Sequence, residues 1–189
     1  MKTGLFFGSF NPIHKGHVEI AEFILKNSDL EEIWFVVSPE NPWKTEQKKP
    51  SSEIRLKMVQ LAIENKTGFR ATNFEEQLAK PSYTYQSLRY LSSKYPDNNF
   101  VLLIGGDNLA EFRKWGNYEK ILSEYEVWAY PRNQTTDTDK SLNIKLIKAP
   151  LLNYSSTEIR ENLQNNASKD TRIDSKVLKF ITKNKLYQS

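Results

Sequence analysis

The sequence predicts an α/β fold in which a mostly parallel sheet carries helices on both faces. Short apolar segments alternate along the chain with segments of helical periodicity, which is the pattern of β-α-β units. Residues 99–107 are apolar almost throughout, as is typical of a strand buried on both faces. Open sheets of this class bind ligands beyond the carboxyl ends of their strands, so we expect the functional residues to follow the strands.

The first part of the chain gives two strand–helix pairs. Residues 4–8 are a short apolar run that ends in glycine, and residues 17–27 place apolar side chains at helical spacing. Residues 32–39 are β-branched and aromatic until a proline stops the strand. Residues 51–65 form an amphipathic helical pattern, with Ser52 as its expected N-cap.

The rest of the chain continues the alternation. Residues 68–74 predict a weaker strand, residues 84–95 a helix ended by Pro96, and residues 99–107 a central strand. Residues 132–143 are polar and predict a surface loop. By the same criteria we expect strands over 125–131 and 143–150 and helices over 155–165 and 173–184.

Composition limits the class of protein. The 189 residues are most simply one domain spanning residues 1–189, with 38% hydrophobic and 26% charged residues. The chain has no cysteine, which excludes disulfides and thiolate chemistry. The N-terminus enters an apolar strand at once and no apolar run approaches a membrane span, so we expect a cytoplasmic protein without a membrane partner. The net charge of +4 suits an anionic ligand without requiring nucleic acid.

The only two histidines, His14 and His17, lie between the first strand and the first helix. Gly8 and Ser9 favour a tight turn with exposed N–H groups, and the following helix start adds unpaired N–H groups and a dipole that attract an anion. Imidazoles three residues apart near a helix start can point the same way and donate hydrogen bonds to phosphoryl oxygens. Gly16 between them would let a ligand approach the backbone closely.

A second candidate phosphate site begins at Ser155. Ser155 and Glu158 match the S-x-x-E capping box, which by itself indicates only a helix start. The hydroxyls of Ser156 and Thr157 and the guanidinium of Arg160 follow within one turn, and they would make a second phosphate cradle after a strand. Two such helix starts point to a nucleoside triphosphate or to two phosphorylated ligands.

Three other classes of site are disfavoured. Two histidines without any cysteine are too few ligands for zinc. The chain has no G-x-x-x-x-G-K-[ST], so it is not a P-loop enzyme, and no G-x-G-x-x-G after the first strand, which makes a hydride-transferring dinucleotide enzyme a poor fit.

The pairing of G-S-F-N-P-I-H-K-G-H near the N-terminus with S-S-T-E-I-R near the C-terminus resembles a nucleotidyltransferase superfamily. Its members include the phosphopantetheine, nicotinamide and nicotinate nucleotide adenylyltransferases. Three further segments, SPENPWK (38–44), PSYTYQSL (81–88) and IGGDNLAEFRKW (104–115), resemble the nicotinate enzymes in particular. The resemblance covers nearly the whole chain and implies a Rossmann-like nucleotidyltransferase fold.

The resemblance also implies two binding regions. The expected ATP-binding residues are Gly8, Ser9, Phe10, His14, His17, Asp107, Arg132, Ser155, Ser156, Thr157 and Arg160. The expected residues for the second substrate are Lys44, Ser82, Tyr83, Thr84, Asp107 and Trp115, with Trp115 stacking on a pyridine ring. The residues expected to act in catalysis are His14, His17, Lys44 and Arg160.

Several of these residues also have an ordinary structural interpretation. Without the resemblance, Trp115 is a core residue, Lys44 a solvated lysine, Asp107 a helix cap and Arg132 a surface arginine. The sequence departs from the family pattern most clearly at Trp43, where a histidine is common. Ser9 and Asn11 replace threonine and aspartate but keep the chemistry of the turn.

The expected reaction is the transfer of the adenylyl group of ATP to nicotinate mononucleotide, which gives nicotinate adenine dinucleotide and pyrophosphate in NAD biosynthesis. The attacking phosphate is already an anion at neutral pH, so no general base is needed. Mg²⁺ is expected to arrive with ATP, held by the triphosphate and water and by no dedicated protein ligand. A homo-oligomer is left open.

Three rival functions remain from the sequence. The first is adenylyl transfer to nicotinamide mononucleotide or another phosphorylated acceptor, and the second is a nucleotide sensor without catalysis. The third is a fragment of an aminoacyl-tRNA synthetase, which shares an H-x-G-H-like signature, although the chain is short for one.

Overall fold

The computed structural model describes residues 1–39, 49–132, 142–152, 154–165 and 170–188. Within these residues, six parallel strands form one open sheet in the order β3-β2-β1-β4-β5-β6. The strands are β1 (Lys2–Gly8), β2 (Glu32–Val37), β3 (Phe69–Thr72), β4 (Asn99–Gly105), β5 (Glu126–Tyr130) and β6 (Lys145–Leu146). The predicted α/β class and parallel sheet are therefore confirmed, and the strand expected to be central, β4, lies inside the sheet between β1 and β5.

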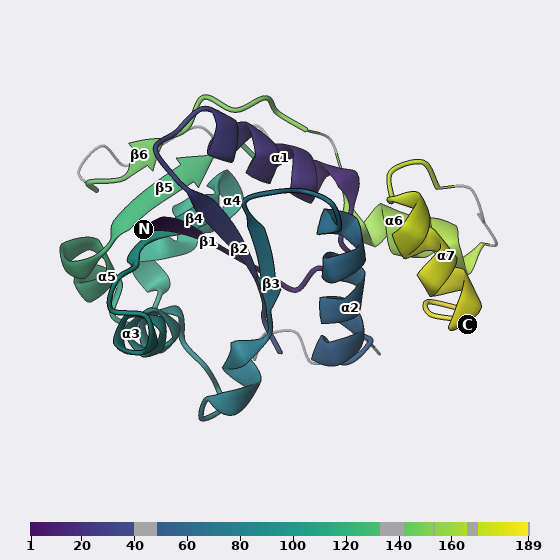
Figure 1. Ribbon diagram of the computed structural model, residues 1–189, viewed down its shortest axis with the longest axis horizontal. Helices are drawn as coiled ribbons and strands as arrows, with labels where there is room; N and C mark the ends of the chain where they lie inside the picture. Colours follow the sequence, from purple (N-terminus) through teal and green to yellow (C-terminus); the bar gives the residue numbers. More distant parts are fainter. Residues whose placement is uncertain (40–48, 133–141, 153, 166–169, 189) are drawn as a thin grey trace.

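Helices cover both faces of this sheet. They are α1 (Lys15–Lys26), α2 (Ser52–Ile63), α3 (Thr84–Lys94), α4 (Gly106–Glu111), α5 (Tyr118–Glu124), α6 (Ser156–Gln164) and α7 (Ser175–Lys183), with 3₁₀ turns η1 (Phe74–Gln77) and η2 (Phe112–Lys114). Figure 1 shows α1 and α2 on one side of the sheet and α3 and α5 on the other, with α6 and α7 beyond α2.

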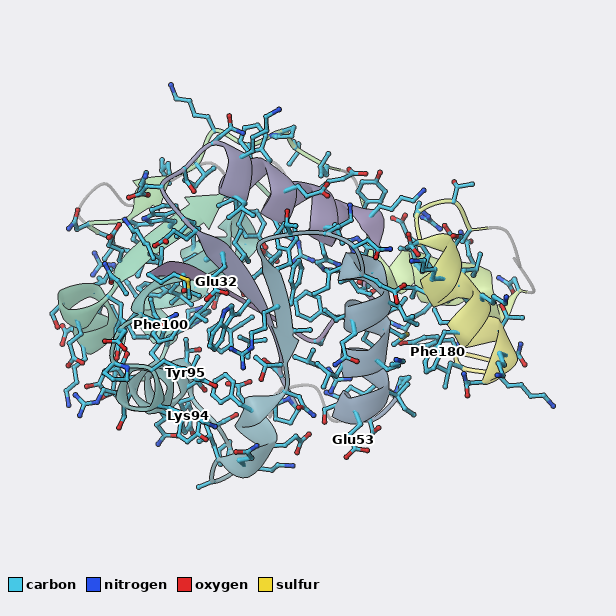
Figure 2. All side chains as sticks on the ribbon, in the orientation of Figure 1. Glu32, Glu53, Lys94, Tyr95, Phe100 and Phe180 are labelled. Carbon is cyan, nitrogen blue, oxygen red and sulfur yellow. The ribbon has the colours of Figure 1, made fainter. Side chains whose placement is uncertain are left out.

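Two hydrophobic clusters lie on the two faces of the sheet because successive strand residues point to opposite faces. In β1, Leu5 belongs to the cluster under α3 and α5, while Phe6 belongs to the cluster under α1, α2 and α7. In β4, Phe100 points to the α3 side, where Figure 2 labels it. Phe180 of α7 lies between α7 and α2 in Figure 2 and packs against the cluster under α1, α2 and α7, so α7 is anchored to the body of the molecule.

Several element ends differ from the expected ones for local reasons. The first helix begins at Lys15 and not at residue 17, with His14 as its N-cap. The N-cap of α2 is Ser51 and not Ser52, because the Ser51 hydroxyl accepts the N–H of Ile54, three residues on. The strand expected over 143–150 is reduced to β6, two residues long, at the edge of the sheet.

Apart from the interpretation of Asp107 as a helix cap, the sequence predicted no element between the strands β4 and β5, where the structure has α4, η2 and α5. These helices are six, three and seven residues long, too short for an apolar periodicity to stand out. Asn117 starts α5 in the left-handed conformation, which asparagine tolerates better than most residues. Most of the predicted loop over 132–143 lies outside the described residues.

Candidate functional site

The site lies at the carboxyl edge of the sheet, where the strand order reverses. The chain runs outward from β1 to β2 and β3, then returns to the other side of β1 for β4, β5 and β6. Gly8 at the end of β1 pairs with Val37 at the end of β2, so the loops after β1 and β2 start side by side. Gly105 at the end of β4 pairs with Tyr130 at the end of β5, so the loops after β4 and β5 do the same. Such a reversal is where open α/β sheets bind their ligands.

The turn after β1 is held by the ring of Phe10. Phe10 has φ +43, a left-handed conformation that costs a non-glycine residue roughly 1–2 kcal/mol. Its ring is buried against Phe6 and Phe35 and lies 5.1 Å from the ring of His17. An added Cβ at Gly8 would lie 2.9 Å from this ring, so glycine is needed there. The predicted turn of Gly8 and Ser9 is therefore present, with its strained residue fixed by packing.

The two histidines form one stacked unit at the start of α1. Their ring centroids are 3.7 Å apart, as expected for side chains three residues apart that point the same way. The backbone N–H of His14 donates to Nδ1 of His17 at 3.3 Å. A neutral ring that accepts at Nδ1 carries its proton on Nε2, so His17 has an N–H donor on the far side of its ring.

His14 is a buried residue whose ring stacks on other rings but forms no hydrogen bond within the described part of the chain. Its side chain is 5% exposed, and neither ring nitrogen finds a hydrogen-bond partner among the described residues. Burial lowers the pKa of His14 to about 3, helped by the positive charges of Arg132 and Arg172 and opposed by Asp170. Burial, then His14 and Arg132, also hold the pKa of His17 well below its usual value. Both histidine rings are therefore neutral at pH 7. Because buried polar atoms are normally hydrogen-bonded, the ring of His14 needs a polar group of a ligand as its hydrogen-bond partner.

Tyr154 closes the stack on its other side. The ring of Tyr154 lies 5.6 Å from that of His14 with only 19° between the planes. The same ring covers Gly16, because a Cβ added at Gly16 would lie 2.4 Å from its Cδ2. The expectation that Gly16 leaves room for a ligand is therefore wrong: the space beside its backbone holds the tyrosine ring.

The late helix start meets the turn after β1, as the sequence predicted. The Ser156 hydroxyl donates to the carbonyl of Pro12 at 3.3 Å, and Nη1 of Arg160 donates to the carbonyl of Asn11 at 2.8 Å. Two helix N-termini, those of α1 and α6, are thereby brought to one place. The N–H groups of Lys15, His17 and Glu158 already have protein acceptors, so the helix dipoles and the remaining N–H groups of the two first turns favour an anion there.

The hydroxyls of this helix start are partly engaged. The Ser155 oxygen accepts the N–H of Glu158 at 3.4 Å, and the Thr157 oxygen accepts from Nη2 of Arg160 at 3.1 Å. Both hydroxyls keep their own hydrogen for a phosphate, whereas that of Ser156 is directed to Pro12. Ser155 is the N-cap as predicted, and the Glu158 carboxylate is paired with Arg172 at 3.2 Å.

Asp107 and Arg132 come together from neighbouring strands. Asp107 follows β4 and Arg132 follows β5, and their Oδ2 and Nη1 atoms are 3.4 Å apart. The other carboxylate oxygen of Asp107 is buried and finds no hydrogen-bond partner among the described residues. An added Cβ at Gly105 would lie 2.5 Å from this oxygen, so glycine leaves the space that it occupies. Since Arg132 also lowers the pKa of both histidines, this pair lies within electrostatic range of them.

Of the residues predicted for the second substrate, Ser82, Tyr83, Thr84 and Trp115 lie on the α3 side of the sheet. Tyr83 is the N-cap of α3 and Thr84 is its first residue, with Ser82 half-buried just before. Tyr83 lies 3.8 Å from the Cβ position at Gly116, and the half-buried Trp115 packs on Phe112 with centroids 5.2 Å apart. The start of α3 and the chain around Trp115 are therefore neighbours. Lys44 and Trp43 lie outside the described residues.

Sequence reasoning missed four residues that shape the site: Arg55, Tyr154, Arg172 and Tyr187. The sequence could have indicated that Arg55 is buried, because Arg55 shares helical spacing with the apolar Met58, Val59 and Ala62. In the structure all four residues are buried, and Arg55 is 0% exposed. A charged residue on an apolar helix face needs a polar partner in the fold. Arg172 pairs with Asp170 at 2.7 Å, and its carbonyl accepts the N–H of Lys15. The tyrosines gave no such signal.

Within the described part of the chain, no group of three or more histidine, aspartate or glutamate side chains could hold a metal ion. None of the helices described there is long and apolar enough to cross a membrane.

The sheet order 3-2-1-4-5-6 is that of a doubly wound α/β fold, and residues 5–162 match the family model described as cytidylyltransferase-like. A Cytophaga hutchinsonii protein named probable nicotinate-nucleotide adenylyltransferase is 44% identical over 191 residues, with both chains covered completely. One of the same name from Flavobacterium psychrophilum is 40% identical over 192 residues, again over both whole chains. The chain belongs to the nicotinate-nucleotide adenylyltransferase family.

Solved structures share the fold. The Plasmodium falciparum nicotinic acid mononucleotide adenylyltransferase complexed with NaAD superposes with a TM-score of 0.83 at 22% identity, covering 98% of this chain and 97% of the other. The same enzyme complexed with APC gives a TM-score of 0.81.

Proposed function

We propose that this protein transfers the adenylyl group of ATP to nicotinate mononucleotide. A 5′-phosphate oxygen of the mononucleotide attacks the α-phosphorus of ATP, the bond from that phosphorus to the bridging oxygen breaks, and pyrophosphate leaves. The convergence of the α1 and α6 helix starts around the neutral His14–His17 stack carries this proposal. The names of the full-length relatives agree with it.

In the proposed reaction the protein aligns the substrates and disperses charge. The attacking phosphate is an anion at neutral pH, so no side chain has to remove a proton. Neutral imidazoles donate hydrogen bonds to oxygens of the reacting phosphoryl group, where charge moves during transfer. The helix starts and Arg160 hold the β- and γ-phosphates, with Ser155 and Thr157 contributing their remaining hydroxyl hydrogens.

The remaining predicted residues bind the ribose, the adenine and the pyridine ring of the substrates. Asp107 offers a carboxylate oxygen to a ribose hydroxyl, and Arg132 lies beside it toward the adenine side. Trp115 stacks on the pyridine ring, and backbone N–H groups at the start of α3 near Thr84 bind its carboxylate. Mg²⁺ is carried in by ATP, and Lys44 is proposed to reach the phosphates from the loop after β2.

The experiment is a pyrophosphate-release assay with ATP and a panel of acceptors: nicotinate mononucleotide, nicotinamide mononucleotide and phosphopantetheine. We expect nicotinate mononucleotide to give the highest kcat/KM, because backbone donors pair better with a carboxylate than with an amide. A higher kcat/KM for the amide would replace the proposed acceptor, and no pyrophosphate with any acceptor would favour a nucleotide sensor. The cytoplasmic location and the oligomeric state stay predictions.

A further inference from the structure

The turn after β1 accepts hydrogen bonds from side chains that come from three distant parts of the chain. Nη1 of Arg55, on α2, donates to the carbonyl of Ser9. Arg160 of α6 donates to the carbonyl of Asn11 at 2.8 Å, and the hydroxyl of Tyr187 donates to the side-chain Oδ1 of Asn11 at 2.8 Å. Arg160 was expected at the site from sequence, whereas Arg55 and Tyr187 have no part in the proposed chemistry.

Arg55 ties this turn to the next loop along the edge of the sheet. Its guanidinium is fully buried and donates to the carbonyls of Ser38 at 2.9 Å and Pro39 at 2.8 Å, the first two residues after β2. Its Nε donates to the carbonyl of Pro50 at 3.0 Å. A buried guanidinium is tolerated only when its donors are satisfied, so these carbonyls and the charge fix one another in place.

Tyr187 reaches the turn from the last residues of the chain. It lies just after α7, which packs on α2 through Phe180 (Figure 2). Its φ of +61 shows that the backbone adopts a left-handed conformation, which is uncommon for a bulky residue. Burial raises the pKa of its hydroxyl, so the hydroxyl stays protonated and donates. Asn11 is itself only 6% exposed, so the bond between them is shielded from water.

Peptide geometry indicates the effect of the hydrogen bond from Arg55 to the Ser9 carbonyl. The Ser9–Phe10 peptide is trans, because only the bonds before Pro12 and Pro81 are cis among the described residues. In a trans peptide the carbonyl and the following N–H point in opposite directions. When Arg55 holds the Ser9 carbonyl, the N–H of Phe10 points the other way, away from Arg55. A fixed peptide dipole aimed at developing charge requires no rearrangement during the reaction.

We propose that Arg55 and Tyr187 are positioning residues for adenylyl transfer: Arg55 holds the Ser9 carbonyl so that the N–H of Phe10 faces the nucleotide, and Tyr187 holds the Asn11 side chain so that the turn keeps this shape. This inference rests on the proposed function, because its effect is read in the rate of that reaction. Neither residue touches the substrate in this arrangement: each acts through the turn that does.

The test is a double-mutant cycle between Tyr187 and Asn11, followed by kcat and by KM for both substrates. Tyr187→Phe removes one hydroxyl, and Asn11→Ala removes its acceptor. Asn11→Asp keeps an acceptor at the same place. The matched control is Tyr125→Phe, which removes a hydroxyl that is hydrogen-bonded to Ser92 at 3.2 Å at the opposite, amino end of β5.

We expect Tyr187→Phe to lower kcat about 3- to 10-fold, the range for one lost hydrogen bond that matters in the transition state. KM for the mononucleotide should not change. The loss should vanish when Tyr187→Phe is made in the Asn11→Ala protein and should persist in the Asn11→Asp protein. Tyr125→Phe should keep the wild-type kcat. Arg55→Lys, which replaces a fork of donors by a point charge, should lower kcat further.

The outcomes separate this inference from the proposed function. If the wild-type protein releases no pyrophosphate with any acceptor, the proposed function fails. If the wild type is active but Tyr187→Phe leaves kcat unchanged, or lowers it equally with and without the Asn11 acceptor, Tyr187 acts by packing alone and the positioning proposal is overturned.

Discussion

At the scale of single residues, the protein uses histidine in its uncharged form. A protonated imidazole would attract phosphate more strongly, but burial and the nearby arginines keep both rings neutral before the nucleotide arrives. In the proposed site, the positive charge comes instead from the guanidinium groups of Arg132 and Arg160. The histidines then provide directed N–H groups whose geometry the stack fixes.

Replacing His17 by alanine should lower kcat by about 10²–10³-fold, the usual loss for one donor that acts on the transition state. The free Nε2–H of His17, set by the bond from the His14 N–H, is the donor that would be lost. Steady-state kinetics would measure the loss, with circular dichroism to show that the variant is folded. A folded His17→Ala protein with near-normal turnover would remove His17 from the reaction.

Stability should fall as the pH falls below about 6.5. In the unfolded chain both histidines have an ordinary pKa near 6.5, whereas the folded protein holds the pKa of His14 at about 3 and that of His17 well below normal. As the pH is lowered, the histidines of the unfolded state therefore bind protons at a higher pH than those of the folded state. The free energy of unfolding should decrease by up to about 1.4 kcal/mol per pH unit for each histidine.

Urea unfolding at pH 7, 6 and 5 measures this slope. The His17→Asn protein, with one such group fewer, is the control and should show a shallower dependence. Equal slopes in the two proteins would show that His17 is not held neutral by the fold.

In the proposed site, Trp115 contacts the mononucleotide before the reaction starts. Stacking on a pyridine ring is equal in the ground state and the transition state, so Trp115→Ala should raise KM for the mononucleotide more than it lowers kcat. Initial rates at varied mononucleotide and saturating ATP test this. Because Trp115 also packs on Phe112, Trp115→Phe serves as a control that keeps an aromatic ring there. An unchanged KM in the alanine variant would show that Trp115 is a core residue and does not bind the mononucleotide.

At the scale of elements, the site depends on how closely α6 approaches α1. Tyr154, just before α6, covers Gly16 of α1 and stacks on His14. The contact leaves no space for even one methyl group. The register between the two helix starts, and hence the place where their dipoles meet, is set by this glycine and this ring.

Gly16→Ala should therefore destabilise the protein and lower its activity. The new Cβ would lie 2.4 Å from the Tyr154 ring, which must move off His14. Overpacking of this kind costs typically 1–3 kcal/mol, which thermal unfolding would show. Adding Tyr154→Ala should remove the clash and recover part of the stability lost. The control is Gly116→Ala, whose nearest neighbour lies at 3.8 Å. Equal melting temperatures for the two glycine variants would contradict this account.

The sequence was most informative about long elements and least informative about contacts between them. Helical patterns located α1, α2, α3 and α7, most clearly α1 and α7, and a capping box located α6, whereas α4 and α5 were too short to be recognised. The meeting of Arg160 with the turn after β1 followed from two helix starts with anion-binding chemistry. The bond of Tyr187 to Asn11, 176 residues away, could not be predicted, because it depends on where α7 docks. The identity of the ring over Gly16 was missed for the same reason.

At the scale of the whole molecule, one sheet supports two cores. The cluster under α1, α2 and α7 and the cluster under α3 and α5 share no helix, but alternate residues of the same strands contribute to both. The phosphate-binding residues proposed here lie with the first cluster and the pyridine-binding residues with the second. In the proposed reaction, a rigid sheet between them fixes the distance between the two substrates.

This arrangement predicts that both cores unfold together. Ile181 of α7 is 2% exposed and Leu88 of α3 is 0% exposed, and they lie in different clusters. Truncation of either to alanine should cost about 2–5 kcal/mol, because each leaves a cavity in a packed core. Since the strands between the clusters cannot keep one face ordered without the other, both variants should shift a single unfolding transition.

Calorimetry and urea unfolding, followed by tryptophan fluorescence and by circular dichroism, would measure this. Trp34 reports on the α3 side and Trp128 on the α1 side, so one transition common to all probes is expected. If Ile181→Ala shifted one transition and Leu88→Ala another, the chain would consist of two separately folding units. The distance between the two substrate regions would then depend on how those units dock, and the sheet alone would not fix it.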